Sequence, residues 1–231
     1  MRKVMVVLSG GQDSTTCLFW AKEKFEEVHC ITFNYGQKHS LELESAKKVS
    51  EMAQVSSHQI IDLPNVLKGR SPLTNPDVEL ETYANYDEMD SIIGNRVEKT
   101  FVPMRNAFFL TLASNYALEK DCYDLVTGVC QEDNANYPDC RQSFISQQEK
   151  TINEALGINN FFIHTPLMYL SKSKIVELAN SLKDCMSAIA YTHTCYKGVF
   201  PPCGQCHSCV LRAYGFDQAG IKDPLLLRNS V

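Results

Sequence analysis

Hydroxyl, carboxylate and glycine residues follow an apolar run at residues 6–16, which read VVLSGGQDSTT. A loop that ends a strand and opens a helix offers backbone N–H groups at the positive end of the helix dipole, and such a loop binds anions. The paired glycines let the backbone approach a phosphate group closely, while Ser9 and Ser14 add hydroxyl donors. Asp13 cannot attract phosphate itself, but its carboxylate can hold a Mg²⁺ ion that phosphate also binds. The segment predicts a nucleotide-phosphate site, and the simpler alternative is a strand-to-helix turn capped by serine.

Positive charge for these phosphates must come from another part of the chain. The loop contains no lysine, and the G-x-x-x-x-G-K-[ST] spacing of other phosphate loops occurs nowhere in the sequence. Lys172, in residues 166–172 (PLMYLSK), follows the last predicted strand, and the carboxyl ends of parallel strands lie together. We predict that Lys172 binds phosphate; the alternative is a solvated lysine in the first turn of a helix.

Four of the ten cysteines crowd near the C-terminus, at Cys195, Cys203, Cys206 and Cys209. Their C-x7-C-x2-C-x2-C spacing suits a tetrahedral Zn²⁺ ion held by four thiolates, and Gly204 permits the tight turn between two of them. Four protein ligands leave no open coordination position, so the metal would be structural and would stabilise an otherwise loose segment. The alternatives are uncoordinated buried cysteines and an iron–sulfur cluster.

The overall composition limits the classes of function. The 231 residues carry a formal net charge of −5, which argues against broad binding to nucleic acid or to an anionic membrane. No apolar run approaches the ~18 residues of a membrane span. Residues 1–11 (MRKVMVVLSGG) run into the glycines without a small-residue cleavage site, so they predict a first strand and not a signal peptide. We expect a cytoplasmic protein that binds neither nucleic acid nor membrane.

Strand-like and helix-like segments alternate along the chain and must position these residues. This alternation is typical of an α/β fold, here a Rossmann-like, doubly wound, parallel five-stranded sheet. We divide the chain into an α/β domain at 1–190 and a zinc-binding segment with a tail at 191–231. Within the α/β domain, residues 64–100 have three prolines and weak periodicity, which predicts an insertion or lid with short helices. The predicted strands are residues 4–8, 29–33, 59–63, 124–129 and 161–164, and the predicted helices are 14–25, 41–53, 107–118, 144–156 and 171–179.

The string S-G-G-Q-D-S resembles the pyrophosphate-binding loop of the N-type ATP pyrophosphatases, the PP-loop superfamily. The resemblance implies an adenine-nucleotide-alpha-hydrolase-like fold whose loop grips the β- and γ-phosphates while ATP is cut between the α- and β-phosphates. The product would be an adenylate, in which AMP is the leaving group on a carboxylate or amide oxygen. The ATP-binding residues that it implies are Leu8, Ser9, Gly10, Gly11, Gln12, Asp13, Ser14, Thr15, Thr16, Cys17 and Leu18.

Five further segments resemble the 7-cyano-7-deazaguanine synthase family within this superfamily, so that the resemblance extends from residue 3 to about residue 214. It implies conversion of 7-carboxy-7-deazaguanine to the nitrile with ammonia and ATP, through an acyl adenylate, an amide and a second adenylation, with release of AMP and diphosphate. It also implies one structural Zn²⁺ per subunit, a homodimer and a place in queuosine biosynthesis. The segments are residues 32–39 (TFNYGQKH), 101–106 (FVPMRN), 127–130 (TGVC), 137–141 (YPDCR) and 164–168 (HTPLM).

Adenylation makes chemical sense because a carboxylate is a poor acyl donor whose leaving group would be oxide, whereas AMP is a much weaker base. Help from the protein must come mainly from positioning the reactants and stabilising charge. Asp13, Arg105 and Lys172 are the predicted catalytic residues. The Arg105 guanidinium suits a forked pair with the substrate carboxylate or with the α-phosphate, and the superfamily uses a lysine after the strand that precedes Lys172.

The substrate residues are predicted with less support from the pattern. Asn106, Asp139 and Arg141 are candidates for reading the purine-like edge of the substrate, because amides and carboxylates match a guanine-type donor pattern. Tyr35 and Gln37 are candidates for lining its pocket. The alternatives are a helix cap for Asn106, a surface ion pair between Asp139 and Arg141, and a core position for Tyr35.

Three features depart from the family pattern. Met104 stands where the family has glycine, residues 131–137 (QEDNANY) replace a run of the type E-T-D-F-S-G-Y, and the gap from Cys195 to Cys203 is one residue shorter. A methionine fills space that a glycine leaves open, so we expect Met104 to narrow the substrate pocket. An alternative prediction is therefore an enzyme that stops at 7-amido-7-deazaguanine.

Two other classes of protein fit part of the pattern. An adenylating tRNA thiolase would need a reactive cysteine near ATP, for which Cys130 or Cys140 could serve, but the acidic residues around them and the lack of a basic stripe argue against it. A zinc-ribbon interaction module on a nucleotide-binding scaffold would fit the cysteines alone, and the intact glycine loop argues against it.

Overall fold

The computed structural model describes residues 2–36, 40–64, 66–132 and 135–228, and within them five strands form one parallel sheet in the order β3-β2-β1-β4-β5. The chain builds outward from β1 to β3 and then crosses back to β4 and β5. The order of the strands thus reverses between β1 and β4, where doubly wound sheets bind their ligands. The predicted fold class is confirmed. The strands are β1 (Lys3–Val7), β2 (Glu27–Asn34), β3 (Ser57–Asp62), β4 (Asp124–Val126) and β5 (Phe162–His164).

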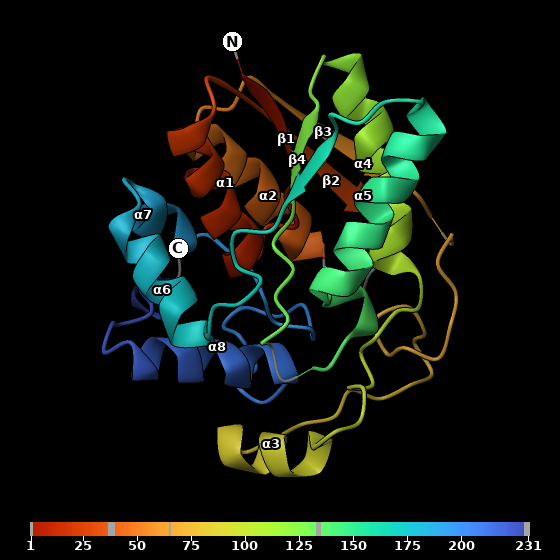
Figure 1. Ribbon diagram of the computed structural model, residues 1–231. Coiled ribbons are helices and arrows are strands. Elements are labelled where there is room, and N and C mark those ends of the chain that lie inside the picture. Colours follow the sequence, from red (N-terminus) through yellow and green to blue (C-terminus); the bar gives the residue numbers. More distant parts are fainter. Residues whose placement is uncertain (1, 37–39, 65, 133–134, 229–231) are drawn as a thin grey trace.

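Helices cover both faces of the sheet (Figure 1). Side chains of β1 alternate between the two faces, as the pleat requires: Val4 and Val6 pack with one group of helices and Met5 with the other. Both groups supply apolar side chains, which explains why β1 reads as a continuous apolar run. On one face lie α1 (Gln12–Lys24), α2 (Ser40–Met52), α6 (Lys172–Ser181) and α7 (Cys185–Ile189), and on the other lie α4 (Arg105–Glu119) and α5 (Gln142–Leu156).

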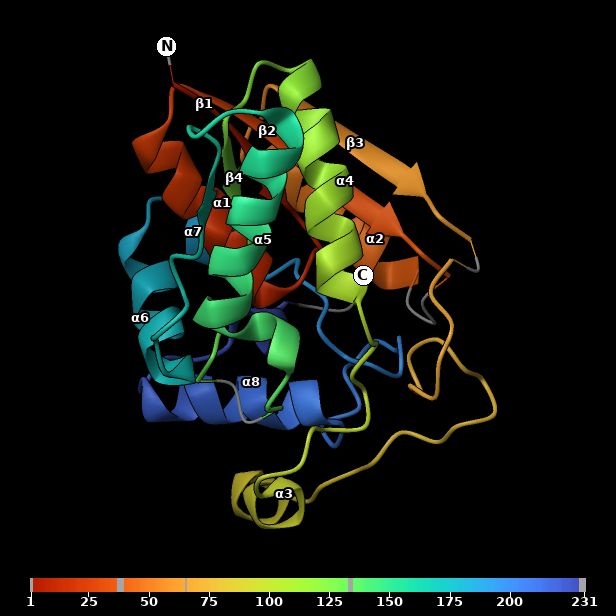
Figure 2. The ribbon, with the colours of Figure 1, turned by 45° about the vertical axis from the view of Figure 1, so that its right-hand side comes forward.

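In its described residues, the excursion at 64–100 contains one short helix, α3 (Tyr86–Ile93), and packs against helix α8 (His207–Gln218). Figures 1 and 2 show α8 crossing beneath the carboxyl end of the sheet, with α3 on its far side. The rings of Tyr86 and Tyr214 stack with their centroids 3.7 Å apart, and Tyr83 N–H donates to the Gln205 carbonyl at 2.8 Å. The excursion is therefore attached to the cysteine-bearing segment.

Several element boundaries differ from the predictions for identifiable reasons. The strand predicted to run to residue 129 ends at Val126, because the chain then turns under the first turn of α1. A Cβ added to Gly128 would lie 3.1 Å from the backbone nitrogen of Ser14, so glycine suits this close approach. The predicted helix cap at Ser171 is confirmed, since its side chain accepts from Lys174 N–H. The pattern missed α7, α8, the short α9 (Pro224–Leu227) and a 3₁₀ turn at Pro138–Cys140.

No helix in the described part of the chain is both long enough and apolar enough to cross a bilayer.

Candidate active site

The glycine loop between β1 and α1 is tightly folded around its two serines. Gly10 has a φ of +88°, and a Cβ there would lie 2.2 Å from the carbonyl oxygen of Glu42, so the position admits only glycine. Ser9 N–H donates to the Ser14 hydroxyl oxygen at 3.1 Å, and the two hydroxyl oxygens lie 3.0 Å apart. The Ser14 hydroxyl also lies 3.2 Å from the Gly11 carbonyl, to which it can donate. The loop is preorganised, with its backbone at the N-terminus of α1.

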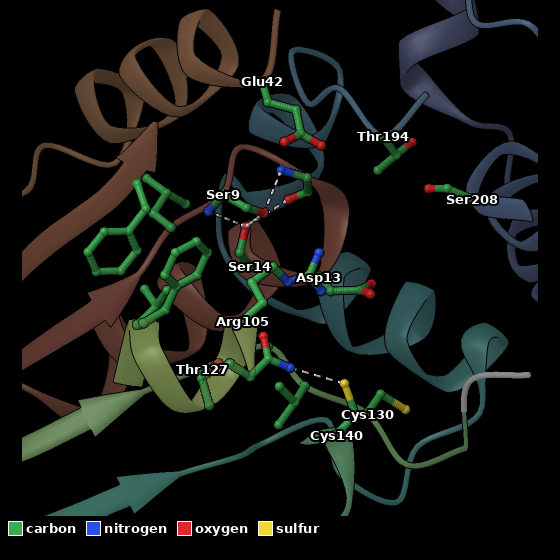
Figure 3. A pocket seen from close by; sticks show the side chains of 18 of the residues that line it. Ser9, Asp13, Ser14, Glu42, Arg105, Thr127, Cys130, Cys140, Thr194 and Ser208 are labelled. Atoms are coloured by element: carbon green, nitrogen blue, oxygen red, sulfur yellow. Dashed lines mark hydrogen bonds between the residues drawn. The ribbon is translucent and has the colours of Figure 1, made fainter. Parts of the chain in front are cut away.

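A cavity of 270 Å³ lies at this loop, where the strand order reverses (Figure 3). The ends of three neighbouring strands contribute Val7, Phe33 and Thr127, and α2 contributes Glu42. The volume is close to the lower end of the range for small-molecule sites. Of the residues predicted from the sequence, those that line it are Leu8, Ser9, Gly11, Gln12, Asp13, Ser14, Tyr35, Arg105 and Asn106.

The remaining predicted loop residues do not line this cavity. Thr16 donates its hydroxyl to the Gln12 carbonyl at 3.0 Å, and the Cys17 thiol lies 3.8 Å from the Thr127 carbonyl. Leu18 belongs to the core between α1 and the sheet. These residues anchor the first turns of α1 and so fix the loop that precedes them. The five predicted positions outside the lining are Gly10, Thr15, Thr16, Cys17 and Leu18.

The structure brings Lys172 to the loop, as the prediction of a shared site requires. Its Nζ donates to Oδ2 of Asp13 at 2.7 Å, and the Lys172 side chain is 9% exposed. Helix α8 approaches α6 closely here: a Cβ added to Gly215 would lie 2.7 Å from Cγ of Lys172. This packing directs the lysine along α8 toward the loop. A solvated lysine, the alternative from the sequence, does not describe this position.

Arg105 is surrounded by tyrosines at the centre of the cavity. Burial opposes its charge, but Tyr35, Tyr137 and Tyr196 outweigh that effect and raise the pKa of Arg105 above its usual range. Glu42 lies across the cavity, and burial raises the pKa of its carboxyl to about 7, although the charge of Arg105 acts in the opposite direction. The cavity therefore holds a permanent cation together with a carboxyl group that titrates near neutral pH.

Not all of the predicted substrate residues line the main cavity. Asn106 lines the cavity, and its backbone N–H donates to Oδ2 of Asp139 at 3.2 Å while its side-chain amide donates to the Asp139 carbonyl at 3.1 Å. Asp139 is buried behind Asn106, outside the cavity lining, and burial raises its pKa. Arg141 is exposed and lines a neighbouring cavity of 190 Å³. Gln37 lies outside the described residues.

Sequence reasoning missed part of the lining. Glu42, Tyr137, Thr194, Tyr196 and Ser208 all face the main cavity. For Glu42 the sequence held a signal, since it lies on the same face of α2 as the buried residues 46 and 49, at helical spacing from them. An acidic residue on such a face indicates a buried polar site. The other four positions depend on how distant segments pack, and no local pattern marks them.

Met104 does not narrow the pocket, and that prediction is wrong. Its side chain is 69% exposed and lies outside the cavity lining. It is the N-cap of α4 and has φ 64° and ψ 3°, in the left-handed region that favours glycine. The position therefore favours glycine for its backbone conformation, and the methionine side chain points to solvent.

The four clustered cysteines are arranged to hold a metal ion. The Sγ atoms of Cys195, Cys203, Cys206 and Cys209 all lie within 4.8 Å of one another, and those of Cys203 and Cys209 are 3.9 Å apart. A tetrahedron with ~2.3 Å metal–sulfur bonds needs sulfur separations of about 3.8 Å, so the set fits. Backbone N–H groups of Tyr196, Cys203 and Cys206 each donate to one of these sulfurs at 3.4 Å. Such bonds stabilise thiolates, the form that binds metal.

Fold and loop together define the class: an α/β protein with a parallel five-stranded sheet and a glycine-rich loop at the N-terminus of α1, where the strand order reverses. The family described as "Queuosine biosynthesis protein QueC" matches residues 3–220, and the chain belongs to this family. The predictions of the family and of an enzyme are confirmed.

Curated relatives agree with this membership. The 7-cyano-7-deazaguanine synthase of Gloeobacter violaceus is 44% identical over 229 residues, which cover 97% of this chain and 96% of the relative. Proteins of the same name from Laribacter hongkongensis and Bacillus subtilis are 45% and 41% identical, over 97% and 94% of this chain and 94% of each relative. Among solved structures, a 4-thiouridine synthetase–RNA complex with bound ATP aligns at 17% identity and a TM-score of 0.49, over 98% of this chain and 52% of its own.

Proposed function

We propose that this enzyme makes 7-cyano-7-deazaguanine from 7-carboxy-7-deazaguanine, ammonia and ATP, and releases AMP and diphosphate. The observation that carries the proposal is the meeting of Asp13 and Lys172 at the glycine loop, beside a cavity that contains Arg105. The arrangement offers phosphate ligands on one side and a cation for a carboxylate or an α-phosphate on the other. The family names carried by the curated relatives support the same reaction.

Different residues of the site bind the phosphates, orient the carboxylate and contact the purine-like edge. Backbone N–H groups of the loop and Lys172 bind the β- and γ-phosphates, and Arg105 orients the carboxylate oxygen toward the α-phosphorus. Asp13 fits Mg²⁺, a cation that prefers carboxylate and phosphate oxygens and would offset the phosphate charge. Asn106 is held in place by Asp139 and presents polar atoms to the purine-like edge. We assign Asp139 to positioning Asn106, and we assign Arg141 no contact with the substrate.

The bonds change in four steps that balance. The carboxylate oxygen attacks the α-phosphorus and diphosphate leaves, which gives the acyl adenylate. Ammonia attacks the carbonyl carbon, and AMP leaves together with one N–H proton, which gives the amide. The amide oxygen then attacks the α-phosphorus of a second ATP and diphosphate leaves. Loss of AMP together with the two N–H protons gives the nitrile. Ammonium must release a proton before it attacks, and we assign this proton to Glu42, whose pKa of about 7 suits a base at neutral pH.

The four cysteines fit Zn²⁺ through their chemistry and spacing, and we propose one zinc ion per subunit. When bound, the ion supplies folding free energy and no open coordination position for substrate. We also propose that ammonia enters as free ammonium and that the protein is a homodimer. The tRNA thiolase alternative loses support, because the Cys130 thiol lies 3.3 Å from the Leu170 carbonyl, to which it can donate, and Cys140 Sγ accepts from Asn106.

Mass spectrometry of a time course tests the proposal. The enzyme is incubated with ATP, Mg²⁺, ammonium and 7-carboxy-7-deazaguanine, and the nucleotide and base products are followed. We expect the amide to rise and fall before the nitrile, with one AMP and one diphosphate for each activation. Amide that accumulates without nitrile would support the enzyme that stops at the amide, and ADP with orthophosphate would refute the proposed loop chemistry.

A further inference from the structure

The excursion holds a short segment of the chain, residues 135–137, by hydrogen bonds. Glu98 N–H donates to the Ala135 carbonyl at 3.0 Å. The side-chain amide of Asn136 donates to two carbonyls of the excursion, each at 3.0 Å. Asn136 has a φ of 55°, in the left-handed region that asparagine tolerates better than most residues with a side chain. The backbone of this segment is therefore fixed by its contacts with the excursion.

Tyr137 completes the attachment through its side chain. Its hydroxyl donates to Oε2 of Glu98 at 3.2 Å and contacts the hydroxyl of Thr100. Its ring packs against that of Phe101, with the ring centroids 5.6 Å apart. Glu98 is only 1% exposed, and the same Oε2 accepts from Thr100 N–H at 2.7 Å. Because a buried carboxyl group needs hydrogen-bond donors, Glu98 holds the tyrosine hydroxyl in place.

Tyr137 lines the main cavity, whereas Glu98 and Thr100 lie outside its lining. Asp139, two residues after Tyr137, accepts from the backbone N–H of Asn106, which also lines the cavity. The tyrosine and the partner of Asn106 thus belong to one short stretch of chain. An aromatic ring on the wall of a cavity suits a planar heterocycle, because aromatic rings favour offset-stacked or edge-to-face contacts with one another.

We infer that Tyr137 contacts the fused ring of the deazaguanine substrate and that Glu98 is a positioning residue that acts through Tyr137. The carboxyl group of Glu98 fixes the hydroxyl, and the fixed hydroxyl sets the orientation in which the ring faces the cavity. Binding residues need such support, because a displacement of about 1 Å can cost about 10²-fold in rate. This inference rests on the proposed function, from which it takes the planar substrate.

The excursion contains a second tyrosine–glutamate pair, which supplies a matched control. The Tyr83 hydroxyl donates to Oε2 of Glu81 at 2.9 Å, and Tyr83 is 2% exposed. Neither residue lines the main cavity. The two pairs therefore share their chemistry and their part of the chain, while only the pair of Glu98 and Tyr137 reaches the cavity, through its tyrosine.

Steady-state kinetics of the full-length enzyme tests the inference. We expect Tyr137→Phe and Glu98→Ala each to raise the KM for 7-carboxy-7-deazaguanine by at least about tenfold, equivalent to about 1.4 kcal/mol, with the KM for ATP unchanged. Glu98→Gln keeps an oxygen acceptor for the hydroxyl and should restore most of the loss. Tyr83→Phe should leave both KM values unchanged. A substrate KM in Tyr137→Phe equal to that of the unmodified enzyme would overturn the inference, even if Glu98→Ala fails to fold.

A double-mutant cycle tests whether Glu98 acts through Tyr137. Glu98→Ala should raise the substrate KM no further in the Tyr137→Phe background, and additive effects would overturn the positioning role. If Glu98→Ala does not fold, Glu98→Asp takes its place, because its shorter side chain withdraws the carboxyl oxygen from the hydroxyl.

The nucleotide products separate this inference from the proposed function. Unchanged KM values in the variants, with AMP and diphosphate still released by the unmodified enzyme, would overturn the inference alone. Release of ADP by the unmodified enzyme would refute the proposed function and, with it, the substrate assigned to the ring of Tyr137.

Discussion

Lys172 and Asp13 are 159 positions apart in the sequence, yet Nζ of the lysine donates to Oδ2 of the aspartate at 2.7 Å. The pair joins the first turn of α6 to the first turn of α1, two helices that pack on the same face of the sheet. Both groups are partly or largely shielded from water, with side-chain exposures of 9% and 25%. A phosphate group that enters the loop would share this lysine with the carboxylate, and Mg²⁺ at Asp13 would complete the charge balance.

Loss of the lysine should therefore slow adenylation specifically. We expect Lys172→Met to lower the rate of AMP formation about 10²–10³-fold, because one preorganised charge opposite the developing negative charge is removed. The measurement is ATP-dependent AMP release with saturating substrate. Lys174→Met is the matched control: Lys174 lies two residues further on and pairs with Glu177 at 2.6 Å on the exposed surface. Equal losses in both variants would contradict the phosphate role.

Removal of the aspartate tests the other member of the pair. Asp13→Ala should abolish AMP formation without a change in fold, because the side chain lies in the first turn of α1, is 25% exposed and is not part of the core. Circular dichroism and thermal unfolding check the fold, and AMP release checks the activity. Unchanged AMP release would show that the loop does not hold the metal–phosphate group.

The cysteine cluster predicts a defined dependence on metal. Cys206→Ala should lose the bound metal and lower Tm by more than about 5 °C, because metal binding supplies folding free energy to the segment that carries α8. Cys122→Ala is the control, since Cys122 is fully buried but lies outside the cluster. Elemental analysis and calorimetry measure the two effects. A Cys206→Ala protein that keeps both its metal and its Tm would contradict the assignment of the four ligands.

At this site the sequence predicted the residues that a contiguous segment or the order of parallel strands places, and it missed the residues that only the packing of distant helices brings in. The strand, the glycines and the helix of the loop are contiguous, and parallel strands force their following segments together, so the loop and Lys172 could be placed in advance. Glu42 and Ser208 reach the cavity only through the packing of α2 and of α8 against the carboxyl edge of the sheet. The first turn of α8 was hidden because a cysteine pattern there reads as metal ligands and gives little helical periodicity. Met104 was misjudged because side-chain volume was considered and backbone φ was not.

The raised pKa of Glu42 predicts that the free energy of unfolding depends on pH. Its pKa is about 7 in the folded protein and 4.5 as its ordinary value, so between these pH values the unfolded chain has lost a proton that the folded protein keeps. The contribution of Glu42 to the free energy of unfolding therefore falls as the pH rises from 4.5 to 7, and the full destabilisation is present above pH 7. Glu42→Gln should raise the free energy of unfolding above pH 7 by on the order of 2–3 kcal/mol, with no gain below about pH 4.5.

Urea unfolding at a series of pH values measures the effect of Glu42→Gln. The same variant should form amide more slowly at limiting ammonium, since it cannot accept the ammonium proton. A variant whose stability follows the same pH curve as the unmodified protein would show that the Glu42 carboxyl is not raised. Amide formation at the original rate would remove its assignment as the base while leaving the stability argument intact.

Replacing Met104 by glycine should change the stability of the protein without changing the product that it makes. Its backbone has φ 64°, a conformation that costs a residue with a side chain about 1–2 kcal/mol relative to glycine. Met104→Gly should therefore raise the free energy of unfolding by about 1 kcal/mol and Tm by about 2–4 °C, while Met104→Ala, which keeps Cβ, should give no such gain. Because the side chain is 69% exposed and outside the cavity lining, neither variant should change the ratio of nitrile to amide in the time course. A shift in that ratio in Met104→Gly alone would mean that this backbone position controls the second adenylation.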